Sequence, residues 1–178
     1  EGYHKKALAV CKKYGVLYVS DEVVTAFGRL GHWFASEDEF GILPDIITCA
    51  KGLTSGYLPL SATILSEEIY DVISKPQEEG AMFTHGFTYS GHPVCCAAGL
   101  ANIQIMERED INGHVRDVGA YFEQQVHSLA DLDIVGDVRG RKFMMCLENL
   151  ADKQSKELFE PKVKVGNRIA DNCQKRGL

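Results

Sequence analysis

VLYVSDEVVTAFGRLG (residues 16–31) joins a run of apolar residues to two adjacent carboxylates, Asp21 and Glu22, and then to a loop punctuated by glycine. Residues 16–20 are rich in β-forming side chains and do not alternate polar with apolar, which predicts a strand buried on both faces of a parallel sheet. Open parallel sheets bind ligands beyond the carboxyl ends of their strands. This stretch therefore predicts an α/β fold with a site at that edge of the sheet.

The composition is typical of a packed globular protein: 178 residues, 45% of them hydrophobic and 25% charged. The formal net charge is −6 and no basic stripe is present, so we expect no nucleic-acid partner. Six cysteines without a C-x-x-C pair predict reduced thiols, and no metal is expected. The sequence has no run of about 18 apolar residues and no signal segment, which predicts a cytoplasmic protein without membrane contact.

Helices and strands are predicted to alternate along the first three quarters of the chain. Further strands are expected at 45–50 and 57–65, where Pro59 limits the start of the second. An amphipathic helix is predicted at residues 3–14, ending near Gly15. Further helices are predicted at 66–75 with Ser66 as N-cap, at 93–108 with Pro93 as the first residue, and at 111–129.

The domain boundary is expected near the end of the last of these helices. Residues 1–131 then belong to a larger domain, and 132–178 begin a smaller α+β domain. DIVGDVRGRKFMMCLENL (133–150) predicts two strands around a glycine turn, and a helix is expected between Pro161 and Gly177. The first residues read as the inside of a helix, so we expect the chain to be a segment of a longer protein.

An acid and a lysine follow two of the predicted strands. The separation of 30 positions between Asp21 and Lys51 (51 − 21) leaves room for the crossover that parallel strands need, so the two side chains are expected to face one cleft. The ordinary alternatives are a turn residue for Asp21 and a solvated charge for Lys51. In CAKGLTSGYLPL (49–60), however, the lysine stands between a buried apolar run and two glycines, a setting suited to an amine nucleophile.

THGFTYSGHP (84–93) is predicted to bind phosphate. Gly86 and Gly91 allow the backbone to approach a ligand closely, Thr88 offers a hydroxyl, and the following helix directs its positive end at the loop. A loop and a helix cap are the simpler explanation of this segment alone. Together with an acid and a lysine, it predicts pyridoxal 5'-phosphate as cofactor, bound through its phosphate, ring nitrogen and aldehyde.

Three ordered motifs also carry a family resemblance: SDEVVTAFGRLG (20–31), PDIITCAKGLTSGYLPL (44–60) and GFTYSGHPVCCAAGLANI (86–103). They resemble the class III (subgroup II) aminotransferases, pyridoxal-phosphate enzymes of fold type I, most closely the ω-amino acid:pyruvate branch. The resemblance implies part of the mostly parallel large-domain sheet with flanking helices, followed by the start of a small α+β domain. It also implies transfer of an amino group from an ω-amino acid or amine to a keto acid such as pyruvate.

Residue by residue, the resemblance implies that Lys51 is the internal Schiff-base lysine and acid–base catalyst, and that Asp21 partners the pyridine N–H. Val23 packs against the ring, with plain core packing as its alternative. Thr88, with the amide of Phe87, binds the phosphate of the neighbouring subunit's cofactor. The expected assembly is therefore a homodimer or a dimer of dimers with shared active sites.

Other functions stay open at this point. Glu22 would point away from Asp21 on a continuing strand and is expected to have at most a supporting role. An aminomutase or a dialkylglycine-type decarboxylase would use the same acid and lysine. A nucleotide-driven ATPase would also place Asp-Glu after an apolar strand, but G-x-x-x-x-G-K-[ST] is absent from these 178 residues.

Overall fold

The computed structural model describes residues 2–76 and 83–178, which form two compact units. The first unit ends at Arg116 and the second runs from Asp117 to Leu178. The division falls inside helix α5 (Ile111–His127). The sequence also predicts a glycine-rich loop from residue 80 to Gly91, of which residues 80–82 lie outside the described residues. The boundary expected near residue 131 stays a prediction.

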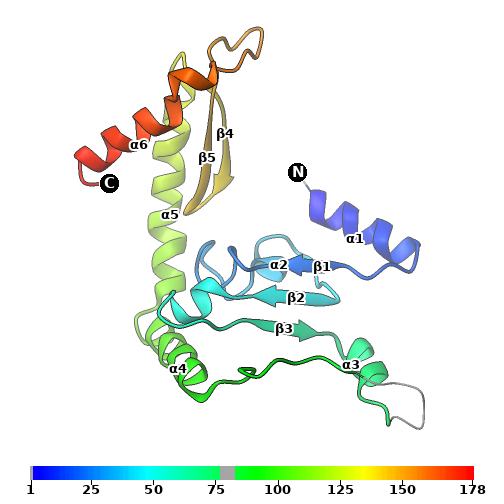
Figure 1. The fold of residues 1–178 in the computed structure, drawn as a ribbon. Coiled ribbons are helices and arrows are strands. Elements are labelled where there is room, and N and C mark those ends of the chain that lie inside the picture. Colours follow the sequence, from blue (N-terminus) through cyan, green and yellow to red (C-terminus); the bar gives the residue numbers. More distant parts are fainter. Residues whose placement is uncertain (1, 77–82) are drawn as a thin grey trace. The chain divides into compact units, whose positions relative to one another are not determined.

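The first unit is built around a three-stranded sheet in the order β1-β2-β3 (Figure 1). β1 (Val19–Asp21) pairs in parallel with β2 (Ile46–Cys49), as expected. β3 (Ala62–Leu65) pairs antiparallel with β2, which corrects the expectation of a third parallel strand. Only 12 residues (62 − 49 − 1) separate β2 from β3, and they contain one short 3₁₀ turn instead of a crossover helix, so the chain reverses.

Each strand is shorter than the apolar run that predicts it. β1 begins at Val19 because the Val16 amide bonds back to Cys11 at the end of the first helix. The expectation that the strands are buried on both faces is wrong for the described residues. The Val19 side chain of β1 is 54% exposed, and the first three residues of β2 are only half-buried.

Helices accompany this sheet at the predicted places: α1 (Tyr3–Lys13), α3 (Glu67–Ile73), α4 (Pro93–Arg108) and α5, with one further short helix, α2 (Ala35–Asp38). Pro93 opens α4 as expected, since a missing N–H costs nothing in the first helical turn. Ser66 occupies the N-cap position of α3, but its hydroxyl makes no capping bond. No helix among the described residues is long and apolar enough to cross a membrane.

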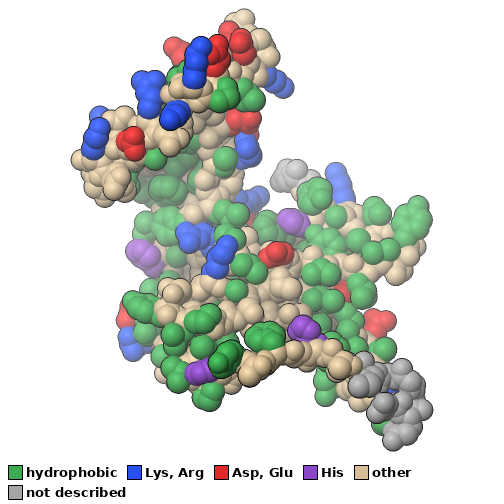
Figure 2. All heavy atoms as spheres, in the orientation of Figure 1, with side chains coloured by type: hydrophobic (Ala, Val, Ile, Leu, Met, Phe, Trp, Pro, Cys, Tyr) green, Lys and Arg blue, Asp and Glu red, His purple; other side chains and the backbone are tan. Residues whose placement is uncertain are grey.

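The core of the first unit includes the glycine-punctuated loop that follows β1. Ala26 and Leu30 of this loop are only 4% and 3% exposed. The other buried apolar side chains of this unit come from elements before and after the loop in the sequence: Leu8, Ala35, Ile42, Cys49, Leu53, Cys95, Met106 and Val115. Hydrophobic side chains also cover much of its surface (Figure 2), among them Tyr57, which is 85% exposed. The loop after β1 is therefore a packed part of the fold.

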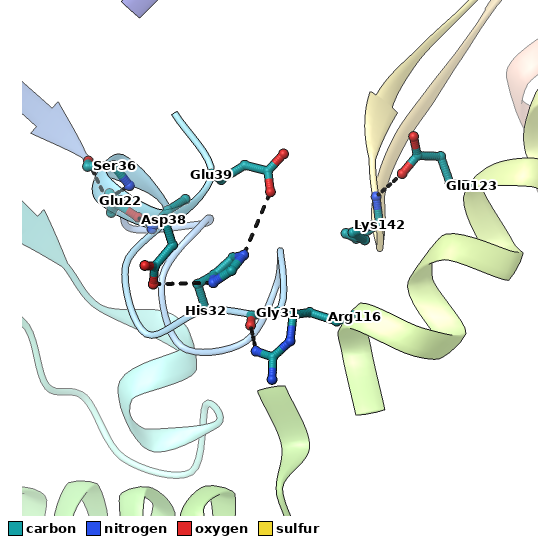
Figure 3. Close-up of polar contacts among 10 residues, drawn as sticks. Glu22, Gly31, His32, Ser36, Asp38, Glu39, Arg116, Glu123 and Lys142 are labelled. Carbon is teal, nitrogen blue, oxygen red and sulfur yellow. Dashed lines mark hydrogen bonds and ion pairs between the residues drawn. The ribbon is translucent and has the colours of Figure 1, made fainter. Parts of the chain in front are cut away.

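The second unit contains an antiparallel hairpin and a helix: β4 (Val135–Arg141), β5 (Met144–Asn149) and α6 (Val165–Lys175). These elements were expected, but the turn does not lie at the glycine. Lys142 and Phe143 connect the strands, whereas Gly140 lies inside β4 with a φ of +122°. The Lys142 amide donates to the Glu123 carboxylate of α5 at 3.1 Å (Figure 3), which anchors the turn to this helix.

Gly140→Ala should destabilise the full-length protein by at least about 2 kcal/mol, because the left-handed φ disfavours a side chain and packed backbone offers no space for one. A Cβ at this position would lie 2.0 Å from the Met144 carbonyl oxygen. Urea unfolding measures the change. The control, Gly166→Ala in α6, meets nothing within 4 Å and should stabilise by about 0.5–1 kcal/mol; equal stability of the two variants would contradict this account of Gly140.

Candidate active site

A cavity of about 1190 Å³ lies in the first unit beside the turn that follows β2. It is lined by Lys51, by residues of the connection from this turn to β3, by Ile69 and Ile73 of α3, and by the segment before α4. Phe87 belongs to that last segment. Two of the predicted site residues, Lys51 and Phe87, therefore face the same cavity although they are 36 positions apart in the sequence (87 − 51).

Lys51 adopts an unusual backbone conformation. It opens the 3₁₀ turn η1 (Lys51–Thr54) directly after β2, with a φ of +40°, and its side chain is exposed. Left-handed non-glycine residues carry strain that the surrounding structure must offset, and such residues concentrate at functional sites. The next residue, Gly52, packs so closely that a Cβ would lie 2.9 Å from the Cβ of Phe27. The turn is therefore fixed against the loop that follows β1.

Asp21 is the last residue of β1 and pairs in register with Thr48 of β2. Because the strands are parallel, Asp21 and Lys51 belong to the same edge of the sheet. One Asp21 oxygen accepts the Val23 amide at 3.0 Å, and the side chain is exposed. Neither Asp21 nor Val23 lines the cavity beside Lys51. Their placement around a shared ligand stays a prediction.

The predicted phosphate-binding segment forms a tight turn before α4. The Phe87 amide donates to the Ser90 hydroxyl at 3.2 Å, and the Ser90 amide donates to the Phe87 carbonyl at 2.9 Å. Thr88 is exposed and does not line the cavity. His92 caps α4, since its Nδ1 accepts the Val94 amide at 3.3 Å. This capping role was not predicted, although the position directly before Pro93 could have indicated it.

Glu22 has a larger structural role than the sequence suggested. Its side chain is 3% exposed and accepts hydrogen bonds from the Ala35 amide at 2.7 Å, the Ser36 amide at 2.8 Å and the Ser36 hydroxyl at 2.5 Å (Figure 3). The Thr25 hydroxyl donates to it as well, at 3.1 Å. The carboxylate therefore caps the N-terminus of α2, which begins 13 positions later in the sequence, and so joins the two ends of the loop after β1.

Two further contacts hold this loop (Figure 3). The His32 ring lies between Asp38 and Glu39, with nitrogen–oxygen distances of 3.2 and 3.7 Å. The Arg116 guanidinium of α5 donates to the Gly31 carbonyl at 2.6 Å. The backbone after Asp21 is thus bound to α2 and α5 by polar contacts, which limits the freedom of the acid at its start.

The chemistry of the described residues favours an amine at this site. Burial raises the pKa of the Cys49 thiol at the end of β2, which makes it a poor nucleophile. The described part of the chain holds no group of three or more His, Cys, Asp and Glu side chains placed to bind a metal. Lys51 supplies the only primary amine among the described residues that line the cavity.

Comparison with known proteins identifies the family. The model of the family Aminotransferase class-III matches residues 1–178. An uncharacterized aminotransferase of Sinorhizobium fredii, y4uB, is 47% identical over 100% of this chain and 38% of its own length. The diaminobutyrate–2-oxoglutarate transaminase of Halomonas elongata is 44% identical over 96% of this chain and 36% of its own length.

A solved structure agrees with these matches. The (S)-enantioselective omega-transaminase of Thermomicrobium roseum superposes with a TM-score of 0.90 and 42% identity, covering 99% of this chain and 38% of that one. The chain belongs to the class-III aminotransferase family, whose members are pyridoxal-phosphate enzymes of fold type I. It spans little more than a third of the length of these relatives.

Glu22→Gln should lower the free energy of unfolding of the full-length protein by about 1–3 kcal/mol. The NH₂ group of the glutamine side chain would face a backbone N–H that needs a hydrogen-bond acceptor. Thermal and urea unfolding measure the change. Glu37→Gln on the exposed face of α2 is the matched control and should change stability by less than about 0.5 kcal/mol. Indistinguishable variants would refute the capping role of Glu22.

Proposed function

We propose that the full-length protein is a pyridoxal-phosphate-dependent transaminase that moves an amino group from an ω-amino acid or amine to a keto acid. The observation that carries the proposal is Lys51, held at a φ of +40° beside a large cavity in a chain of the class-III aminotransferase family. Lys156 and Lys164 are left-handed and exposed as well, so it is the cavity beside Lys51 that distinguishes it from a solvated surface lysine.

The residues present fit the cofactor. The Lys51 amine can bond to an aldehyde, the cavity of about 1190 Å³ is large enough for a small aromatic molecule, and its lining combines apolar and hydroxyl groups. Pyridoxal phosphate, when bound, supplies an aldehyde that takes up an amine and a ring that accepts electrons from the substrate carbon.

Lys51 and Asp21 are the proposed catalytic residues. The Nζ atom of Lys51, when not bonded to the cofactor, would take the proton from the substrate carbon that bears the amino group and would later return a proton. The Asp21 carboxylate at the end of β1 holds the proton on the cofactor's ring nitrogen. The parallel pairing of β1 with β2, which puts both residues at one edge, supports this division of roles.

Val23, Phe87 and Thr88 are proposed to bind the cofactor: Val23 against its ring, and the Phe87 amide and Thr88 hydroxyl at its phosphate. Phosphate binding by Phe87 requires its amide to leave the Ser90 hydroxyl, which it contacts at 3.2 Å. We expect the phosphate to belong to a neighbouring subunit's cofactor, and therefore a homodimer or a dimer of dimers. The expected cytoplasmic location is part of the same proposal.

The names of the relatives bear on the amino donor and the keto-acid acceptor. A diaminobutyrate transaminase and an omega-transaminase are both among the similar proteins, which supports a donor with a terminal amine. The first of these is named for 2-oxoglutarate, whereas the branch that the sequence resembles uses pyruvate. Assays of the full-length protein with one amine donor and each keto acid in turn will identify the acceptor.

Lys51→Ala should lower the turnover number by at least about 10²-fold, because the group that moves the proton is removed. It should still bind the cofactor, but without a covalent bond. In the unmodified protein, borohydride reduction followed by peptide mapping should find the pyridoxyl label on Lys51. Lys12→Ala on the exposed face of α1 is the control. Substantial turnover by Lys51→Ala, or a label on another lysine, would overturn the assignment.

Asp21→Asn should reduce the rate of amino transfer on the order of 10²-fold, since a neutral amide no longer stabilises the protonated ring nitrogen. The variant should keep its stability, because the exposed side chain can still accept the Val23 amide. Stopped-flow measurement of a single half-reaction checks this. The control is Asp133→Asn, an exposed residue of the second unit, and an unchanged rate in Asp21→Asn would remove Asp21 from the mechanism.

A further inference from the structure

One side chain of α4 binds both ends of the turn that carries Lys51. The Nδ2 group of Asn102 donates to the Gly52 carbonyl at 2.9 Å and to the Leu53 carbonyl at 3.2 Å. Its Oδ1 accepts the Ser55 hydroxyl at 2.7 Å. Asn102 is thus a donor to the start of the turn and an acceptor at its end.

This turn is short and strained, and it is held by the packing of Gly52 against Phe27, by its own backbone hydrogen bonds and by Asn102. η1 is four residues long, and the residues at its two borders, Lys51 and Ser55, are left-handed with φ values of +40° and +51°. The Gly52 carbonyl accepts the Ser55 amide at 3.2 Å as well as the Asn102 side chain, so both of its lone pairs are used. Short 3₁₀ turns have poor internal hydrogen-bond geometry, so contacts from outside the turn help to keep the two left-handed residues in place, and Asn102 makes three of them.

The helix that supplies Asn102 is well placed for this contact. Gly99, one helical turn earlier, is buried, and a Cβ there would lie 3.0 Å from Leu60, so α4 approaches the segment after the turn closely. The same helix begins directly after the Phe87 segment that lines the cavity. Asn102 therefore joins the turn to the helix that continues from another segment lining the cavity.

We propose that Asn102 is the positioning residue of Lys51: its three hydrogen bonds hold the turn in the conformation that directs the amine into the cavity. The inference rests on the proposed role of Lys51 as the cofactor-binding lysine. Asn102 touches neither substrate nor cofactor in this role. It acts through the backbone of Gly52 and Leu53 and through the hydroxyl of Ser55.

The test uses the full-length protein and the variant Asn102→Asp, which keeps the shape of the side chain but replaces the donor with an acceptor. The control is Gln104→Glu, which makes the same charge change at an exposed position of α4. Hydrogen exchange of residues 50–57 is measured in the cofactor-free protein. Exchange in Asn102→Asp should rise about tenfold over the control, because the turn opens more often.

A second measurement follows the amine itself. Cofactor is added, and the pyridoxyl label trapped on Lys51 by borohydride is quantified over time. We expect about tenfold slower labelling in Asn102→Asp, since the amine less often faces the cavity. If Asn102→Asp fails to fold, Asn102→Ala removes the same contacts without adding charge and serves in both measurements.

The outcomes separate the two proposals. Exchange and labelling rates within twofold of the control, with the label on Lys51, contradict the role of Asn102 and leave the proposed function intact. A label on a different lysine in the unmodified protein contradicts the proposed function, and the positioning role with it. Faster exchange together with slower labelling of Lys51 supports both.

Discussion

The pairing of β1 with β2 is the constraint on which the rest of the site depends. The two strands run parallel with Asp21 opposite Thr48, and the Glu22 amide continues the ladder by donating to the Thr48 carbonyl at 2.8 Å. An antiparallel pairing would put the ends of the strands at opposite edges of the sheet. Because the strands are parallel, the acid after one and the lysine after the other start from the same edge.

Both chain segments that leave this edge are then fixed by polar side chains. Glu22 closes the loop after β1 by accepting two amides at the start of α2, and Asn102 closes the turn after β2 by contacting three of its residues. In each case a buried or half-buried side chain forms hydrogen bonds with backbone groups of the segment that it holds. The site residues themselves are exposed, and their positions are set by these neighbours.

Much of this arrangement could be predicted from local patterns. Pro93 marks the start of α4, the spacing of Ile111 and Val115 predicts α5, and the apolar runs that end before Asp21 and Lys51 predict two parallel strands. These features depend on residues a few positions apart. The position of Lys51 between an apolar run and two glycines was likewise visible in the sequence.

The remainder depends on contacts between distant residues, which no local pattern contains. The direction of β3 follows from where its connection passes, not from its own apolar residues. The hairpin turn at Lys142 was predicted at a glycine because turn chemistry favours glycine, but the Glu123 carboxylate of α5 stabilises the turn instead. Glu22 and Asn102 bind partners 13 and 50 residues away, so their roles required the folded structure.

The separation between Asn102 and Gly52 has a kinetic consequence for folding. The hydrogen bond between the Asn102 side chain and the Gly52 carbonyl closes a loop of 50 residues. The chain must lose the conformational entropy of this loop before the hydrogen bond contributes any stability. The strained turn at Lys51 should therefore become ordered only after α4 has docked. On a growing polypeptide the lysine would reach its final geometry only after the ribosome has synthesised the helix that restrains it.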